Sequence, residues 1–271
     1  MNSTLVRAIS GAIYVLLLIA CILYSSHSVL MLFGIFLILA TIEFSKLVKL
    51  NSIVAVCIAT GLFLFFGFTN TNKTYDILLL ILSLVVSMKA LIFLFDNNMK
   101  PINDVSKTIY LVGYVAIPFI IITKIPFVNG NSFEPKTLLS LFILIWVNDT
   151  FAFIVGKSLG KNKLFEKISP KKTIEGFIGG MFFSLVASVV LAKYFVIEPV
   201  SKWLVIAIIS SVFGTLGDLI ESKFKRIAGV KDSGSIMPGH GGVLDRLDSI
   251  IFVAPFIYLF YQILYYISNY A

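Results

Sequence analysis

Long apolar runs follow one another along the whole chain and constrain its fold more than any other feature. A run of about 17–25 apolar residues can cross the roughly 30 Å hydrocarbon layer of a bilayer as a helix. Of the 271 residues, 58% are hydrophobic and only 13% are charged, whereas about a quarter of the residues in a typical soluble domain are charged. The sequence therefore predicts an all-α fold, a polytopic integral membrane helical bundle without an independent soluble domain.

Nine runs qualify as transmembrane helices, which places the two termini on opposite sides of the membrane. The side of the N-terminus carries sixteen loop lysines and arginines, and the other side carries four. Because cytoplasmic loops are enriched in these residues, we expect an inner (cell) membrane protein whose N-terminus and two most basic loops are cytoplasmic. The predicted spans are Ile9–Tyr24, Val29–Ile42, Ile53–Phe68, Ile77–Phe95, Thr108–Thr123, Leu138–Val155, Ile174–Val196, Trp203–Ile220 and Ile250–Ile267.

The polar residues are distributed unevenly along the chain. Residues 1–140 have short loops with scattered charges, and we interpret them as membrane scaffold helices. Within this part, Glu43 ends the second span, and we expect it to be a solvated helix end. Residues 141–271 contain two long polar loops and form the predicted catalytic region.

The first polar region begins inside an apolar run, at Asn148 and Asp149. An acid at membrane depth is costly unless it has a partner, a ligand or water. Asp149 is therefore a candidate site residue.

A basic segment, "SPKKT", follows from Ser169 to Thr173. It resembles a helix start, with Ser169 as N-cap and Pro170 at the first helical position. Lysine has the wrong charge for the N-terminal end of the helix dipole, so an anionic ligand on the exposed N–H groups would explain Lys171 and Lys172. The enrichment of cytoplasmic loops in lysine explains their number but not their placement, and both interpretations remain open.

The second polar region begins inside the eighth span. Four polar residues spaced i, i+3, i+4 and i+7 share one helix face that starts in the membrane and runs out of it. Gly214 and Gly217 precede this face and would let another helix or a ligand approach closely. The four polar residues are Asp218, Glu221, Ser222 and Lys225.

A glycine-rich loop follows, and a further helix begins after it. The glycines prevent regular structure between Ser233 and Gly242, and their bare backbone could present N–H groups to phosphate oxygens. In the next helix, Asp245 and Asp248 lie at i and i+3 on one face near the N-terminal end.

Two acidic helix ends thus flank a glycine-rich loop and a group of cations. Carboxylates from separate elements are the usual protein part of a Mg²⁺ site, which leaves phosphates and waters to complete the coordination. We predict Asp218 and Asp245 as metal ligands, with Asp248, Asp149 and Glu221 as further candidates. The alternative, mutual salt bridges in an ordinary surface loop, does not explain why glycines and an acid at membrane depth occur together.

The stretch "SKFKRIAGVKDSGSIMPGHGGVLDRLDS", from Ser222 to Ser249, resembles the signature of phosphatidate cytidylyltransferases, also called CDP-diacylglycerol synthases. The signature reads S-x-x-K-R, then K-D, then P-G-H-G-G-x-x-D-R-x-D, and this chain matches every fixed position. "SPKKTIEGFIGG" resembles a second block of that family, except that Ile174 stands where the family often has Trp. The motifs cover roughly the last 120 residues, while the first 140 match only in hydropathy and in an Arg near the start.

The resemblance implies a polytopic helical enzyme, often a dimer. Such an enzyme converts CTP and phosphatidic acid to CDP-diacylglycerol and pyrophosphate with Mg²⁺ as cofactor. The expected partners are CTP and phosphatidic acid in the bilayer, and we expect no nucleic-acid partner. A homodimer is compatible with the resemblance. The two acids at the metal of the family would correspond to Asp218 and Asp245.

The residues suit this reaction. A phosphate monoester has a second pKa near 6, so phosphatidate already carries nucleophilic oxygens at neutral pH, and the main requirement is to reduce charge repulsion. With the two predicted metal ligands, the expected catalytic residues are Lys225, Arg226, Lys231, His240 and Arg246. The expected substrate contacts are Ser169, Lys171, Lys172, Thr173, Glu175, Ser222, Lys223, Asp232, Gly239, Gly241 and Gly242. His240 could bind phosphate, act as a general acid or only cap the turn.

Other functions remain as alternatives. A CTP-dependent polyprenol (dolichol-type) lipid kinase would release CDP, and its alcohol acceptor would need His240 or Asp149 as a base. A membrane transporter could use buried Asp and Lys as an ion pathway, although the sequence shows no inverted repeat. A CDP-alcohol phosphotransferase is disfavoured because its D-x-x-D-G-x-x-A-R motif is absent from the sequence.

Overall fold

The computed structural model describes residues 3–68, 73–97, 99–130, 132–237, 239 and 241–270. Ten α-helices account for most of these residues: α1 Ser3–Tyr24, α2 Ser26–Val48, α3 Ser52–Phe68, α4 Lys73–Phe95, α5 Asp104–Tyr110, α6 Ile117–Lys124, α7 Pro135–Leu159, α8 Ile174–Val190, α9 Val200–Ile227 and α10 Leu244–Tyr270. The remaining elements are the π-helical segments η1 Leu111–Ala116 and η3 Leu191–Val196, the short 3₁₀ helix η2 Ile125–Phe127, and the strands β1 Lys163–Phe165 and β2 Ser169–Thr173.

The predicted all-α membrane architecture is confirmed. In the described part of the chain, seven helical segments are long and apolar enough to cross a membrane, counting α5 to η2 as one segment and α8 with η3 as another. The apolar stretches Ala8–Tyr24 of α1 and Ser52–Gly67 of α3 are shorter, so their crossing stays a prediction. Outward-facing side chains such as Ile13, Val85 and Phe182 are about 60% exposed, as expected for surfaces in contact with lipid.

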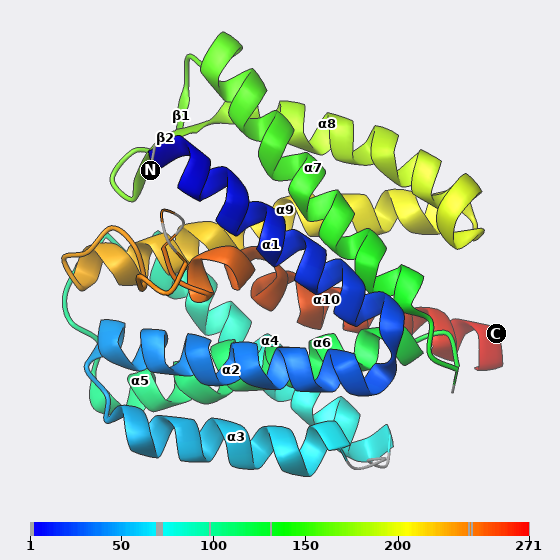
Figure 1. Cartoon of the computed structure of the whole chain (residues 1–271), viewed down its shortest axis with the longest axis horizontal. Helices are drawn as coiled ribbons and strands as arrows, with labels where there is room; N and C mark the ends of the chain where they lie inside the picture. Colours follow the sequence, from blue (N-terminus) through cyan, green and yellow to red (C-terminus); the bar gives the residue numbers. More distant parts are fainter. Residues whose placement is uncertain are drawn as a thin grey trace.

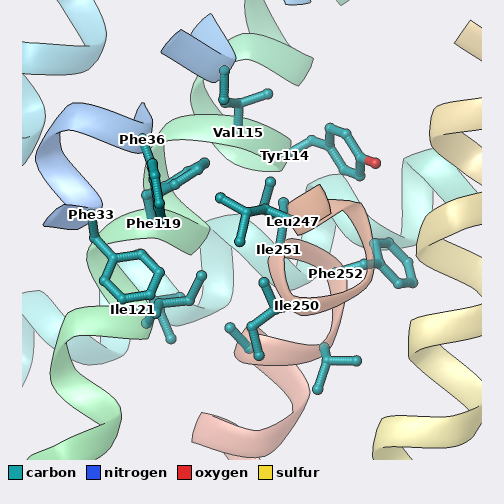
Figure 2. Packing of buried hydrophobic residues seen from close by; sticks show 14 of the residues in the cluster. Phe33, Phe36, Tyr114, Val115, Phe119, Ile121, Leu247, Ile250, Ile251 and Phe252 are labelled. Atoms are coloured by element: carbon teal, nitrogen blue, oxygen red, sulfur yellow. The ribbon is translucent and has the colours of Figure 1, made fainter. Parts of the chain in front are cut away.

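The interior of the bundle is aromatic and tightly packed. Phe33 of α2 packs against Phe119 of α6, with ring centroids 6.4 Å apart, and Tyr114 of η1 packs against Phe252 of α10 at 6.3 Å (Figure 2). The cluster fixes α10 against α2, η1 and α6, so the helix that carries Asp245 starts from a rigid position.

Both polar regions lie at one end of the bundle. The N-terminal end of α1, the β1–β2 hairpin and the segment between α9 and α10 lie together at the left of Figure 1, while the C-terminus lies at the right. The prediction that the polar loops share the side of the N-terminus agrees with this arrangement.

The predicted helix start at Ser169 is wrong. Ser169–Thr173 forms β2, which pairs with β1 in an antiparallel hairpin. The helix begins only at Ile174, where the side chain of Thr173 accepts a hydrogen bond from the N–H of Gly176 at 3.1 Å. Lys171 and Lys172 therefore lie on β2, before the N-cap Thr173, and not in a first helical turn.

Candidate active site

Three carboxylates meet where α9 and α10 approach each other. Asp218 and Glu221 of α9 and Asp248 of α10 each offer an oxygen within 4.8 Å of the others, close enough to hold one cation together. The close approach depends on Gly217, because a Cβ there would lie 2.7 Å from the carbonyl oxygen of Asp248 and from the Cβ of Phe252. The shared helix face predicted for α9 therefore points at α10, and a small residue makes the contact possible.

Two lysines face these acids. The ammonium group of Lys172, on β2, lies 2.6 Å from the carboxylate of Asp218. The ammonium group of Lys225 contacts the carboxylate of Glu221 and lies 2.6 Å from that of Asp245. A buried charge is tolerated only when it is paired, and these lysines offset part of the negative charge.

The cluster nevertheless has more carboxylates than cations, because only Lys172 and Lys225 are paired with its acids. Glu221 is fully buried, and its Oε1 atom has no hydrogen-bond partner among the described residues. Buried polar atoms are normally satisfied by hydrogen bonds or by an ion. An orphaned carboxylate oxygen beside two other carboxylates is the arrangement that a divalent cation would complete.

Lys172 is held in its charged form. Burial lowers the pKa of its ammonium group, but the neighbouring carboxylate of Asp218 outweighs this effect, and the pKa lies above its ordinary value. Lys172 is therefore a permanent cation at neutral pH.

Asp245 organises the glycine-rich loop. Besides Lys225, its carboxylate accepts hydrogen bonds from the N–H and the hydroxyl of Ser233, both at 2.9 Å, and from the N–H of Gly242 at 2.7 Å. These contacts fold the loop back onto the start of α10. The predicted role of Asp245 as a metal ligand stays a prediction.

Glu43 is the residue that the sequence did not reveal, and the expectation of a solvated helix end is wrong. It is only 3% exposed, and its carboxylate accepts hydrogen bonds from the N–H groups of Val243 (3.1 Å) and Leu244 (2.8 Å) and from the hydroxyl of Ser233 (3.1 Å). The first N–H groups of a helix have no partner within it, and an acid there also suits the helix dipole. An acid at the polar-loop end of an apolar helix was the only signal, and its partners lie about 200 residues away in sequence.

The loop glycines are required by backbone geometry and by close contacts. Gly239 and Gly241 have φ values of 76° and 84°, a region that side chains disfavour. A side chain on Gly242 would overlap the carboxylate of Glu43 and the hydroxyl of Ser233. Pro238 and His240 lie outside the described residues, so the predicted roles of His240 stay predictions.

Three predicted site residues hold backbone segments. Lys223 donates hydrogen bonds to the carbonyl oxygens of Phe93 and Asp96, at the end of α4. Arg226 donates to the carbonyl oxygens of Ile168 (3.3 Å) and Val230 (3.0 Å).

The third is Glu175. It accepts hydrogen bonds from the N–H groups of Lys161 and Asn162 and from the side-chain amide of Asn162, and so fastens the hairpin to α8.

The structure thus gathers only part of the predicted set. The acidic cluster includes Asp218, Glu221, Asp248, Asp245, Lys172 and Lys225, and Ser222 joins it through a 3.1 Å hydrogen bond to Asp218. Lys171, Lys231 and Asp232 are exposed, and Ser169 is half-buried in β2. Substrate contacts by these four residues stay predictions.

A cavity of about 270 Å³ adjoins the cluster. It is enclosed by α1, α7 and α10, and its charged wall includes Asp149, Arg246 and Asp248. Two further predicted residues, Asp149 and Arg246, therefore lie next to the acids although they come from different helices.

The sequence profile of the cytidylyltransferase family matches residues 5–264. The chain belongs to this family. Among its relatives is the phosphatidate cytidylyltransferase of Staphylococcus aureus (strain COL), 38% identical over 252 residues that cover 90% of this chain and 94% of the relative. The protein of the same name from Staphylococcus haemolyticus is 38% identical over 254 residues, and that from Staphylococcus epidermidis is 37% identical over 252, with the same coverage of both chains.

As a cytidylyltransferase, the chain resembles its relatives beyond the motif region. The match starts in α1 and includes α2, so the helices interpreted as scaffold belong to the shared family architecture. The resemblance inferred from the motifs is confirmed.

Proposed function

We propose that this cytidylyltransferase transfers the cytidylyl group of CTP to phosphatidic acid and releases pyrophosphate. The observation that carries the proposal is the group of the half-buried Asp218 and the buried Glu221 and Asp248 between two lysines, at one end of a bundle of apolar helices. An anionic lipid and an anionic nucleotide can meet there. The acyl chains stay between the helices and the bilayer, and the nucleotide arrives from water.

The bond changes are simple. A phosphate oxygen of phosphatidate attacks the α-phosphorus of CTP, the new P–O bond forms, and the bond between the α- and β-phosphates breaks with departure of pyrophosphate. Phosphatidate needs no base, because its second pKa near 6 leaves it largely dianionic at neutral pH. Lys172 and Lys225 contribute positive charge beside the reacting phosphates, where it counters their mutual repulsion.

We propose Mg²⁺ as the cofactor, held by Asp218 together with Glu221 and Asp248. The fit rests on three carboxylate oxygens within reach of one ion and on the orphaned Oε1 of Glu221. A bound Mg²⁺ would screen phosphate charge during the displacement. Asp245, predicted as the second ligand from the sequence, remains a candidate, since the ammonium group of Lys225 contacts both its carboxylate and that of Glu221.

We further propose that the enzyme lies in the cell membrane with this end of the bundle in the cytoplasm. The bias of lysines and arginines toward the loops on this side supports the orientation. CTP is then available from the cytosol, and a homodimer is compatible with the family resemblance.

A product assay tests the proposal. Purified protein is incubated in mixed micelles with CTP labelled at the α-phosphate, and either phosphatidic acid or dolichol is the acceptor. The expected products are labelled CDP-diacylglycerol and pyrophosphate, formed only with phosphatidic acid. Release of CDP with phosphorylated dolichol would instead establish a lipid kinase and overturn the proposal.

A further inference from the structure

The cavity between α1, α7 and α10 has one apolar wall and one charged wall. Val15 of α1 and Phe142 and Trp146 of α7 line the apolar side, while Arg246 and Asp248 of α10 line the charged side. Apart from Met237, all lining residues lie on the three helices and not in the loops. A molecule bound there would have a charged end next to the acidic cluster and an apolar end between membrane helices.

Tyr14 marks the polar part of this cavity. Its ring packs against Phe36 of α2, with centroids 6.0 Å apart, and the residue is only 8% exposed. Its hydroxyl group is buried and has no hydrogen-bond partner among the described residues, although the residue lines the cavity. A buried hydroxyl normally finds a partner, and nothing in the described part of the chain fills that role for Tyr14.

Arg246 lines the same cavity. The residue is exposed, and its guanidinium group makes no ion pair with a carboxylate in the described part of the chain. An unpaired guanidinium and an unpartnered hydroxyl together can donate hydrogen bonds to the phosphate and ester oxygens of a phosphate monoester.

We infer that this cavity binds the phosphate and glycerol part of the lipid acceptor, with Tyr14 as a residue that determines acceptor affinity. The inference rests on the proposed function and assigns one of its two substrates to this site. Arg246 faces the lipid phosphate, and the Tyr14 hydroxyl donates to a phosphate or ester oxygen. The apolar wall contacts the first acyl carbons.

The lining favours the lipid over the nucleotide. A nucleotide carries a polar base and sugar that would have to face Val15, Phe142 and Trp146, all on helices with apolar character. Asp149, Asp245 and Asp248 also line the cavity, so a dianionic phosphate is repelled unless a divalent cation lies between them. Lipid binding is therefore expected to require the cation.

Tyr14→Phe tests the inference because it removes only the hydroxyl group. We expect the KM for dioctanoyl phosphatidate to rise about three- to tenfold, as for loss of one hydrogen bond, while the KM for CTP and the melting temperature stay unchanged. Binding of labelled dioctanoyl phosphatidate with Mg²⁺ and without CTP should weaken by the same factor. Val15→Phe, which places a larger side chain on the apolar wall and so reduces the space in the cavity, should likewise raise only the KM for the lipid.

Tyr261→Phe is the matched control. Its hydroxyl is also buried and without a partner among the described residues, but it lies about four turns along α10 from Asp245, and both KM values should be unchanged. Unaltered lipid binding in Tyr14→Phe and Val15→Phe, or an equal effect on CTP, would overturn the inference while leaving the proposed function intact. Wild-type protein that forms no CDP-diacylglycerol would overturn both.

Discussion

The carboxylate of Glu43, in α2, accepts a 2.8 Å hydrogen bond from the backbone N–H of Leu244, the first residue of α10. The same carboxylate accepts from Val243 and from the hydroxyl of Ser233. One buried acid thus fixes both the end of the glycine-rich loop and the start of the helix that carries Asp245 and Asp248. Glu43 is a positioning residue, because its carboxylate holds the backbone at the start of α10 and the hydroxyl of Ser233, which also contacts Asp245.

Glu43→Gln should impair catalysis without changing the size of the side chain. The amide keeps one acceptor oxygen, but its NH₂ group replaces the other and faces groups that are themselves donors. Leaving a buried donor without an acceptor costs about 1–3 kcal/mol of stability. We expect kcat to fall at least about tenfold with a smaller change in the KM for CTP, together with a lower melting temperature. Asp104→Asn, at an acid with a 90% exposed side chain, is the control and should behave as wild type. Full activity of Glu43→Gln would show that the loop does not depend on this acid.

Substitution of single carboxylates should separate the proposed metal ligands from Asp245. Asp218→Asn and Asp248→Asn are expected to lower kcat by about 100-fold or more and to raise the Mg²⁺ concentration needed for half-maximal activity, because each removes an anionic ligand. Asp245→Asn should reduce activity with little change in Mg²⁺ dependence, since its carboxylate is bonded to Lys225, Ser233 and Gly242. A Mg²⁺ titration of all three variants is the measurement. A shift in Asp218→Asn and Asp245→Asn, but not in Asp248→Asn, would favour the pair predicted from the sequence.

Chelation should abolish turnover reversibly. Three clustered carboxylates repel a phosphate unless a cation lies between them, so EDTA is expected to stop pyrophosphate release and added Mg²⁺ to restore it. Tryptophan fluorescence measured in parallel should show that the protein stays folded. Undiminished turnover in EDTA would rule out the proposed cofactor.

Lys172 and Lys171 form a natural pair for comparison, since they are neighbours on β2 but only Lys172 contacts Asp218. Lys172→Met should lower kcat/KM by about tenfold or more, as for loss of a charge-assisted hydrogen bond, while Lys171→Met should have a smaller effect. The raised pKa of Lys172 means that its ion pair is fully present below the ordinary lysine pKa and is lost only as pH rises through the higher folded value. Activity should therefore show no loss attributable to Lys172 between pH 7 and about 9, as a pH profile of wild type and Lys172→Met would reveal.

Gly217→Ala should push α9 and α10 apart. The added Cβ would meet the carbonyl oxygen of Asp248 at 2.7 Å, and overpacking of this kind costs about 1–3 kcal/mol. We expect a lower melting temperature and a strong loss of activity. Gly61→Ala, where a Cβ would meet nothing within 4 Å, should leave both unchanged. Equal behaviour of the two variants would show that the close helix contact is dispensable.

The sequence alone determined the class of fold and which polar residues share a helix face. Apolar runs of membrane-spanning length leave little choice but helices, because backbone polar groups in lipid must be satisfied within the element. Local spacing was also sufficient to predict that one helix face is shared by Asp218, Glu221, Ser222 and Lys225, because the helical period determines which residues are neighbours on a helix surface. The motif from Ser222 to Ser249 was specific enough to indicate the family.

Only the tertiary structure decided which of these groups meet. Lys223 and Lys225 are two residues apart in one helix, yet one ammonium holds the end of α4 and the other lies between Glu221 and Asp245. Glu43 and Tyr14 come from helices whose sequences indicate only a membrane span, and tertiary packing brings Glu43 to the start of α10 and Tyr14 to the cavity beside it. Contacts between residues about 200 positions apart depend on how helices pack, which no local pattern encodes, and this is why the acids could be predicted but their partners could not.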